Sequence, residues 1–372
     1  MEMTRRERMM RPGPKRILTL DGGGIRGVVA LEILAKIESM LGQRYGREGS
    51  FVLADYFDFV AGTSTGAIIA AGIANGFSVA KILSFYLECG ATMFERASLF
   101  ERFHSKYRDD AFSAKLRDVF GGDVLLGSEN LQTLLMMVMR NASTDEAWCV
   151  TNNPFAKFNE DLRHPQLSLP LWKMVRASTA APSFFPPEVV KLGEHEFVFI
   201  DGCISTYNNP AFQAFLHATA QPYGIRWPTG QQELLLVSIG AGNVPHVNRN
   251  LKRSDMNLLY DAVELTPAMI LSSVHEQDML CRLFGRCLAG PALDRELGDL
   301  VDIAAPGGRN LFTYLRYNEN LTAEGLARLG LSHIAPEFVQ PMDSVLHIDA
   351  LAEIGREIGE RQVRLDHFAD FL

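Results

Sequence analysis

Within the first 80 residues, the spacing of apolar positions changes twice from that of a strand to that of a helix. Residues 16–20 form a short apolar run that ends at a glycine-rich turn, and residues 28–41 then place Leu, Ile and Val largely on one side of a helix. The same order recurs as an apolar run, a small-residue turn and a helical stretch over residues 56–62, 62–66 and 67–77. Two strand–turn–helix units in succession indicate an α/β fold with a largely parallel sheet.

The rest of the chain predicts more strands and helices. Apolar and β-branched runs predict strands at residues 147–153, 196–201 and 233–240. Helical spacing favours helices at residues 81–139 with short breaks, at 171–181 up to Pro182, over most of the chain after Asn243, and at 344–372 as one or two charged amphipathic helices.

The segment of residues 59–80 contains no charged side chain. It is long enough to span a bilayer, and Gly62 and Gly66 have the GxxxG spacing of packed membrane helices. An ordinary buried helix is a second interpretation. Thr63, Ser64 and Asn75 dilute the apolarity, so we favour a strand and a helix joined by a turn in a core that is covered on both faces.

Composition narrows the classes of partner. The 372-residue chain has a net charge of -8, which argues against DNA or RNA as the main partner. Its five cysteines are odd in number and fit no zinc template, as expected of reduced thiols in a cytosolic protein. The beginning of the chain shows no secretory signal. Residues 1–14 are basic, which indicates a frayed tail or a weak contact with anionic lipid head groups.

The turn GTSTG at residues 62–66 matches the pattern G-x-S-x-G. In a sharp strand-to-helix turn of this kind, the glycines allow strained backbone angles and the central serine projects above the sheet. Ser64 would then stand at the N-terminus of the next helix, where the helix dipole favours developing negative charge. The pentapeptide alone is weak evidence, and an ordinary glycine-rich turn is the alternative.

The turn DGGGIRG at residues 21–27 allows two interpretations. Gly22, Gly24 and Gly27 match the G-x-G-x-x-G fingerprint of dinucleotide sites. That fingerprint requires an acidic residue at the end of the next strand, which here ends with Val60-Ala61-Gly62. The other interpretation is an oxyanion hole of consecutive backbone amides, with Arg26 fixing the turn or adding positive potential.

A nucleophilic serine needs a base, and the histidines are poor candidates. None of the nine histidines lies in a convincing loop at a strand end. Asp201 ends the strand predicted at residues 196–201, and the carboxyl ends of strands in an α/β sheet gather at one crevice. Asp201 can therefore meet Ser64 and accept its proton directly if the surroundings raise its basicity. An ordinary Asp-Gly turn is the alternative.

Taken together, these features resemble the patatin-like phospholipase family. The resemblance rests on DGGGIRG, GTSTG, YLECGATMF (86–94), ASTAAPSFFPP (177–187), Asp201-Gly202 and LLVSIGAG (235–242) in that order. It implies a three-layer α/β fold with a central, largely parallel sheet flanked by helices. The expected organisation is a single domain with a basic flexible tail (1–14), a patatin-like catalytic core (15–245) and a mostly helical C-terminal part (246–372).

The same resemblance implies the chemistry. Ser64 would be the nucleophile and Asp201 the base of a dyad, and the amides of Gly22, Gly23 and Gly24, supported by Arg26, would form the oxyanion hole. An acyl pocket would be lined by Thr65, Ala181, Pro182, Phe184 and Phe185. The implied activity is phospholipase A-type hydrolysis of acyl esters through an acyl-serine, without a metal or other cofactor. Cys203 departs from the family's usual Asp-Gly-Gly or Asp-Gly-Ala, which affects local packing more than chemistry.

The expected partners follow from this activity. They are a phospholipid or other lipid ester, and the inner face of a membrane contacted peripherally from the cytoplasm; a homodimer is left open. Residues 92–103 are either an interfacial lid or a helix packed on the core. Two alternatives remain: the same hydrolase switched on by a cyclic di- or trinucleotide as a bacterial anti-phage effector, and a catalytically weak binding or storage protein with the same fold.

Overall fold

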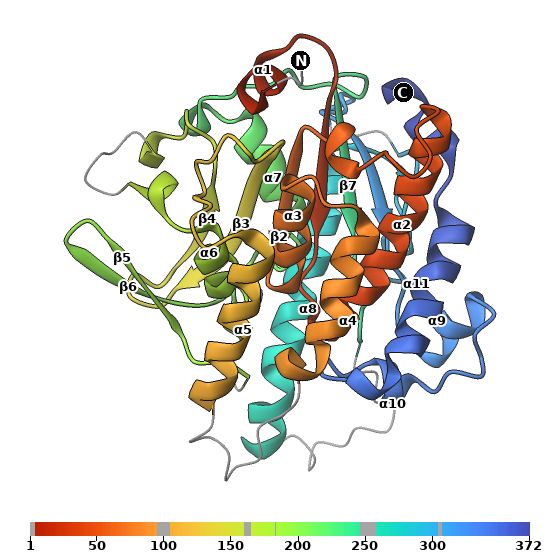
Figure 1. Cartoon of the computed structure of the whole chain (residues 1–372). Helices are drawn as coiled ribbons and strands as arrows, with labels where there is room; N and C mark the ends of the chain where they lie inside the picture. The colour runs from red at the N-terminus through yellow and green to blue at the C-terminus, as the bar shows by residue number, and fades with distance from the viewer. Residues whose placement is uncertain (1–3, 95–104, 160–164, 183, 246–257, 304–306) are drawn as a thin grey trace.

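One sheet with helices on both faces forms the body of the protein (Figure 1). The computed structural model describes residues 4–94, 105–159, 165–182, 184–245, 258–303 and 307–372. Over these residues the chain has the three-layer α/β architecture expected from the sequence. None of the described helices combines the length and the apolarity that a bilayer span needs.

The sheet is mixed and mostly parallel. Its described strands are β1 (Lys15–Leu20), β2 (Phe59–Thr63), β3 (Leu134–Asn141), β4 (Glu146–Thr151), β5 (Glu188–Leu192), β6 (His195–Asp201), β7 (Leu234–Ile239), β8 (Arg286–Ala289) and β9 (Thr313–Tyr317). They lie in the order β5-β6-β3-β2-β1-β7-β9-β8, and β4 also pairs with β3. All pairs from β3 through β2, β1, β7 and β9 to β8 are parallel, whereas the pairs that include β4, β5 or β6 are antiparallel.

The helices cover the two faces unequally. The described helices are α1 (Arg5–Met10), α2 (Gly27–Arg44), α3 (Thr65–Ala74), α4 (Val79–Phe94), α5 (Ser105–Phe120), α6 (Leu171–Ser178), α7 (Ala211–Thr219), α8 (Leu258–Phe284), α9 (Ala323–Arg328), α10 (Pro336–Val339) and α11 (Ile348–Gln362). Helices α2 to α6 and α11 share one apolar cluster, and α7 and α8 contribute to the cluster on the opposite face. In Figure 1 the first group lies in front of the strands and α7 and α8 lie behind them.

The central strands read as continuous apolar runs because both of their faces are buried. Ile17 of β1 belongs to the cluster that includes α7, and its neighbour Leu18 belongs to the cluster that includes α2. The same alternation holds for Leu134 and Leu135 of β3. Successive side chains of a strand point to opposite faces, so a strand between two helical layers needs an apolar residue at nearly every position.

The prediction of helices throughout residues 81–139 is wrong at its end. Helices α4 and α5 lie there, but residues 134–141 form strand β3 in the middle of the sheet. The local sequence predicted a helix because Leu and Met have high helix propensity. This run is nevertheless a strand, because it is buried on both faces and pairs with three other strands. The sequence analysis also did not anticipate strands β5, β8 and β9.

Residues 5–10 do not belong to a flexible tail, which the sequence analysis expected over residues 1–14. Residues 5–10 form helix α1, in which Arg5 and Met9 are buried. Arg5 donates a hydrogen bond to the carbonyl oxygen of Ser128 at 2.6 Å, and Trp227 Nε1 donates to the Met9 carbonyl at 2.9 Å. These hydrogen bonds of Arg5 and Trp227 with backbone carbonyls hold helix α1 against the core. The predicted lid at residues 92–103 lies mainly outside the described residues.

The first turn of helix α3 packs directly against the backbone of the sheet, which the glycine at position 66 permits. A Cβ atom added to Gly66 would lie 2.4 Å from the Leu20 carbonyl oxygen and 2.7 Å from that of Asp21. These atoms belong to the backbone at the end of β1 and cannot move aside as a side chain could. Gly66 therefore sets how closely the helix that follows Ser64 approaches β1.

We expect the substitution Gly66→Ala to lower the free energy of unfolding by at least about 1–3 kcal/mol, because the added methyl group overlaps backbone atoms. Chemical denaturation of the purified variant measures this loss. Gly122→Ala is the matched control, since a Cβ at Gly122 meets no atom within 4 Å. Equal stability of the Gly66→Ala variant and the wild type would contradict the close packing of α3 on β1.

Candidate active site

Ser64 occupies a strained position between β2 and α3. Its backbone angles are φ 54° and ψ -126°, a region that non-glycine residues rarely adopt. The Ser64 N–H donates a hydrogen bond to Ser178 Oγ at 3.0 Å, and Ser178 Oγ donates in turn to the Val138 carbonyl at 2.6 Å. Helix α6 and strand β3 thus hold the turn in place. Ser178 lies in the stretch that the sequence analysis singled out, but the analysis gave it no role.

Asp201 reaches Ser64 because β2 and β6 pair with the same edge of β3, one after the other. Strand β2 pairs with β3 only as far as Thr63, which faces Val138. Strand β6 pairs with the next residues of β3, and its last residue, Asp201, faces Met139. Along that part of β3, β4 occupies the other edge, so β2 and β6 share one edge. The ends of two strands distant in sequence therefore meet at one point.

The two side chains are hydrogen-bonded. Ser64 Oγ donates to Asp201 Oδ2 at 2.6 Å, and the other carboxylate oxygen accepts a hydrogen bond from the Cys203 N–H at 2.8 Å. Asp201 is fully buried and Ser64 is 7% exposed. Burial raises the pKa of the Asp201 carboxyl from its usual value to about 6, against the lowering effect of its two hydrogen bonds. The structure thus brings together the two residues that the sequence analysis paired.

The glycine-rich turn lies directly beside Ser64. A Cβ atom on Gly22 would lie 3.1 Å from Ser64 Cβ. The Gly22 N–H already donates to the Asn208 carbonyl at 3.1 Å, and the Gly23 N–H makes a long bond of 3.3 Å to Thr65 Oγ1. Gly24 has a φ of +64°, which suits glycine, and no acceptor in the described residues takes its N–H. Of the three amides, those of Gly23 and Gly24 are the more available to an incoming oxyanion.

Arg26 binds backbone carbonyl groups of this turn and of the residues next to β7. Its Nε donates to the Gly23 carbonyl at 3.3 Å and its Nη1 donates to the Gly242 carbonyl at 3.1 Å. Arg26 is buried, and burial lowers the pKa of its guanidinium to about 10, which still leaves it charged at neutral pH. The side chain therefore fixes the turn and places positive potential next to it.

A small cavity of about 40 Å³ connects the dyad with the glycine turn. Of the residues predicted to form an acyl pocket, Thr65, Ala181, Phe184 and Phe185 line it and Pro182 does not. The lining also includes Thr179, Cys203 and Met342, to which the sequence analysis gave no part in the pocket. Met342 could not have been found by motif, because it lies in an irregular segment about 140 residues after Asp201 and only the fold brings it there.

No histidine is among the described residues that line this cavity. His217 is the most deeply buried of the described histidines, and its Nε2 lies 3.3 Å from Asn153 Nδ2. Burial lowers the pKa of His217 to about 3, so this ring is neutral and its contacts are structural. Among the described residues, the acceptor of the Ser64 hydroxyl hydrogen is the Asp201 carboxylate.

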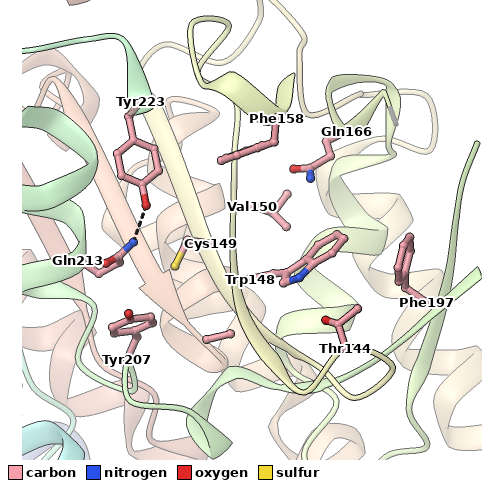
Figure 2. A pocket seen from close by; sticks show the side chains of 11 residues that line it. Thr144, Trp148, Cys149, Val150, Phe158, Gln166, Phe197, Tyr207, Gln213 and Tyr223 are labelled. Carbon is pink, nitrogen blue, oxygen red and sulfur yellow. Dashed lines mark hydrogen bonds between the residues drawn. The ribbon is translucent and has the colours of Figure 1, made fainter. Parts of the chain in front are cut away.

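A larger cleft of about 620 Å³ lies along β4, away from the dyad (Figure 2). On one side of the strand Cys149 faces Tyr207, Gln213 and Tyr223, and on the other side lie Trp148, Val150, Phe158, Gln166 and Phe197. Gln213 Nε2 donates to the Tyr223 hydroxyl at 2.9 Å. Among the described residues that line it there is no carboxylate, histidine, lysine or arginine, so its size alone does not make it the reaction site.

The family comparison covers the part of the chain in which this site lies. The model of the patatin-like phospholipase family matches residues 18–215, which include the glycine turn, Ser64 and Asp201. Patatin-like protein 1 of Arabidopsis thaliana is 30% identical over 293 residues, which cover 71% of this chain and 68% of that protein. Patatin-T5 of Solanum tuberosum is 28% identical over 251 residues, covering 63% of this chain and 62% of that protein. The chain thus spans about two thirds of the length of these relatives.

Two solved structures show a more distant similarity. VipD from Legionella pneumophila is 12% identical, with a TM-score of 0.36 over 94% of this chain and 66% of that one. The type III effector protein ExoU is 11% identical, with a TM-score of 0.22 over 72% of this chain and 54% of that one. Scores this low add nothing to the assignment of the site.

Proposed function

The chain belongs to the patatin-like phospholipase family, and from this premise we propose that it is a serine hydrolase that cleaves fatty acyl esters of lipids. The observation that carries the proposal is the 2.6 Å hydrogen bond from Ser64 Oγ to Asp201 Oδ2, at a cavity that the glycine turn also lines. A nucleophile, a base and amide donors within one cavity are the three groups that acyl transfer needs.

In the first half of the proposed reaction, the Ser64 oxygen attacks the ester carbonyl carbon while its proton moves to Asp201 Oδ2. The carbonyl oxygen becomes an oxyanion, which accepts hydrogen bonds from the amides of Gly23 and Gly24, and the positive end of α3 and Arg26 add favourable potential. The tetrahedral intermediate then expels the alcohol, which takes the proton from Asp201. The acyl group remains on Ser64.

In the second half, water replaces the alcohol. Asp201 takes one proton from the water molecule, whose oxygen attacks the acyl carbonyl carbon, and the same amides stabilise the second oxyanion. Collapse of this intermediate releases the fatty acid and returns the proton to Ser64. A buried carboxyl whose pKa is about 6 is a stronger base than an ordinary aspartate, and it is still ionised at neutral pH.

The lining of the cavity favours an acyl chain as the substrate group. Ala181, Phe184, Phe185 and Met342 provide an apolar wall next to the dyad. A cavity of about 40 Å³ holds only a few water molecules, so the wall must move apart when a lipid enters. We infer phospholipase A-type cleavage of membrane phospholipids at a peripheral contact with the bilayer. Contact with the inner face of a membrane and homodimer formation stay predictions.

The dyad predicts the effect of two substitutions. Ser64→Ala removes the nucleophile and Asp201→Asn removes the base, so each should lower kcat for a fatty acyl ester by at least about 1,000-fold. Hydrolysis of phospholipid in liposomes and of a soluble acyl ester measures the loss. Ser84→Ala is the control, because Ser84 is an exposed serine on α4 whose hydroxyl donates to the Ala80 carbonyl of the same helix. Wild-type rates in either dyad variant would refute the dyad.

A covalent probe separates an enzyme from a binding or storage protein with the same fold. A fluorophosphonate reacts with activated serines, so we expect one label per chain, at Ser64, and no label in the Asp201→Asn variant within the same time. Mass spectrometry of the labelled peptide identifies the site. Failure of the wild type to react would favour the binding or storage alternative.

The pKa of Asp201 predicts the pH profile. Asp201 must be deprotonated to accept the Ser64 proton, so activity is present above the pKa and is lost as the pH falls through it. With a pKa of about 6, kcat/KM should fall about tenfold for each further pH unit below that value. A soluble ester avoids the titration of lipid head groups. A rate that does not change across this pKa would exclude Asp201 as the base.

Control by a cyclic di- or trinucleotide, in the manner of an anti-phage effector, stays a prediction of the sequence analysis. A ligand with phosphate groups favours a cationic site. In the part of the chain that the structure describes, the residues that line the large cleft along β4 are uncharged. Titration of cyclic nucleotides into the liposome assay tests such control, and an unchanged rate with every nucleotide would remove it.

A further inference from the structure

The glycines have no side chains, so the turn is oriented by bonds to its backbone, such as that of Gly22 to Asn208, and by the residues on its two flanks. On the C-terminal side, the Ile25 N–H donates to the Met342 carbonyl at 2.9 Å and Arg26 binds the Gly23 carbonyl. On the N-terminal side, the turn begins at Asp21, whose N–H donates to the Ile239 carbonyl at 3.1 Å. The Asp21 carboxylate does not line the reaction cavity and takes no part in the proposed chemistry.

Arg316 of β9 binds this carboxylate with both ends of its guanidinium group. Nη1 donates to Asp21 Oδ1 at 2.9 Å and Nη2 donates to Oδ2 at 2.6 Å. Arg316 is 1% exposed and Asp21 is 5% exposed. In the sheet register Arg316 lies opposite Ser238 of β7, and its Nη1 also donates to Ser238 Oγ at 2.8 Å. The side chain thus reaches across β7 to the end of β1.

A second buried ion pair lies on the far side of Arg316. Asp278 Oδ2 is 3.8 Å from Arg316 Nε, and Arg282 holds Asp278 with two hydrogen bonds of 2.8 and 2.9 Å. The Tyr314 hydroxyl donates to Asp278 Oδ1 at 3.0 Å. The two arginines and two aspartates balance in charge, but only the pair of Arg316 and Asp21 touches the glycine turn. The pair of Arg282 and Asp278 is therefore a natural internal control.

A buried ion pair often adds little net stability, because desolvation of the two charges offsets their attraction. Its contribution here is geometric. Two parallel hydrogen bonds to one carboxylate fix both the position and the rotation of that group, which a single contact does not. Asp21 is one peptide unit before Gly22, so a rotation at Asp21 moves the amides that face Ser64.

We propose that Arg316 is a positioning residue for the hydrolysis: its bidentate bond to Asp21 helps to orient the amides of Gly23 and Gly24 toward the oxyanion. The proposal rests on the proposed function. It also extends the site beyond residues 18–215, the range that the family model matches, to a strand in the later part of the chain.

The test compares two substitutions of the same kind in the same network. Arg316→Lys keeps the charge but loses the bidentate bond to Asp21. Arg282→Lys makes the same change at Asp278, which does not contact the glycine turn. For each variant we would measure thermal stability, kcat and KM on a soluble acyl ester, and inhibition by an acyl trifluoromethyl ketone, which forms an oxyanion on Ser64.

We expect Arg316→Lys to lower kcat about 10- to 100-fold with little change in KM, because misplaced amides stabilise the transition state less than a correctly placed set. Binding of the trifluoromethyl ketone should weaken by a similar factor, while binding of the product fatty acid stays unchanged. Arg282→Lys should lower the melting temperature to a similar extent and leave kcat within about twofold of the wild type.

A second variant keeps the test decisive if Arg316→Lys does not fold. Asp21→Asn combined with Arg316→Gln removes both charges together, so no buried charge is left unpaired. We expect this double variant to fold and to show the same loss in kcat and in ketone binding. A folded double variant with wild-type kcat would overturn the proposal.

Equal losses of kcat in Arg316→Lys and Arg282→Lys would also overturn it, because the network would then act only through stability. Failure of the proposed function looks different. In that case the wild type would not react with the fluorophosphonate at Ser64 and would not hydrolyse the ester, whatever residue stands at position 316. If the wild-type activity depends on Ser64 but the Arg316→Lys variant has the same kcat, only the positioning role of Arg316 is rejected.

Discussion

The hydrogen bond between Ser64 and Asp201 depends on a single feature of the sheet: two strands share one edge of β3, one after the other. Strand β2 leaves that edge after Thr63, and β6 joins it with Asp201 facing the next residue of β3. Three backbones therefore crowd at one point. A Cβ on Gly202 would lie 2.3 Å from the Val138 carbonyl oxygen and 3.0 Å from Thr63 Cγ2, and one on Gly62 would lie 2.2 Å from the Gly66 carbonyl oxygen. The small residues around the dyad are consequences of this crowding.

The same crowding sets the electrostatics of the site. Asp201 is fully buried, and the groups that compensate its charge are the Ser64 hydroxyl and the Cys203 amide, with the Arg176 cation contributing at longer range. This set is weaker than a direct ion pair, so burial dominates and the carboxyl becomes more basic than an ordinary aspartate. Asp21 differs in its partner. It is buried to a similar degree, and burial raises its pKa as well, but a guanidinium binds both of its oxygens, which makes it a fixed anchor.

Local sequence patterns were sufficient to predict those parts of the fold whose structure is determined within a short segment. Strand β1, the glycine turn, helix α2 and the unit around Ser64 were predicted because each has its own period or turn chemistry. Strand β3 was missed because its Leu- and Met-rich sequence has helix propensity, and only its neighbours make it a strand. Asp201 was identified because it ends a strand beside a glycine. Arg316 lies inside a short strand, so its contact with Asp21 has no local signature.

The later part of the chain completes the site. The family model ends at residue 215, yet the turn that it contains is held by Arg316 from β9 and by the carbonyl of Met342, and Met342 is among the residues that line the cavity beside Ser64. Strand β9 pairs with β7, which pairs with β1, so this part of the chain belongs to the same sheet as the dyad. Without β9 and the segment around Met342, the glycine turn would keep Arg26 and its backbone bonds to Ile239 and Asn208, but it would lose the partners of the Asp21 carboxylate and of the Ile25 N–H. The amides would then be held less firmly, and an oxyanion hole depends on donors that are already oriented before the charge develops.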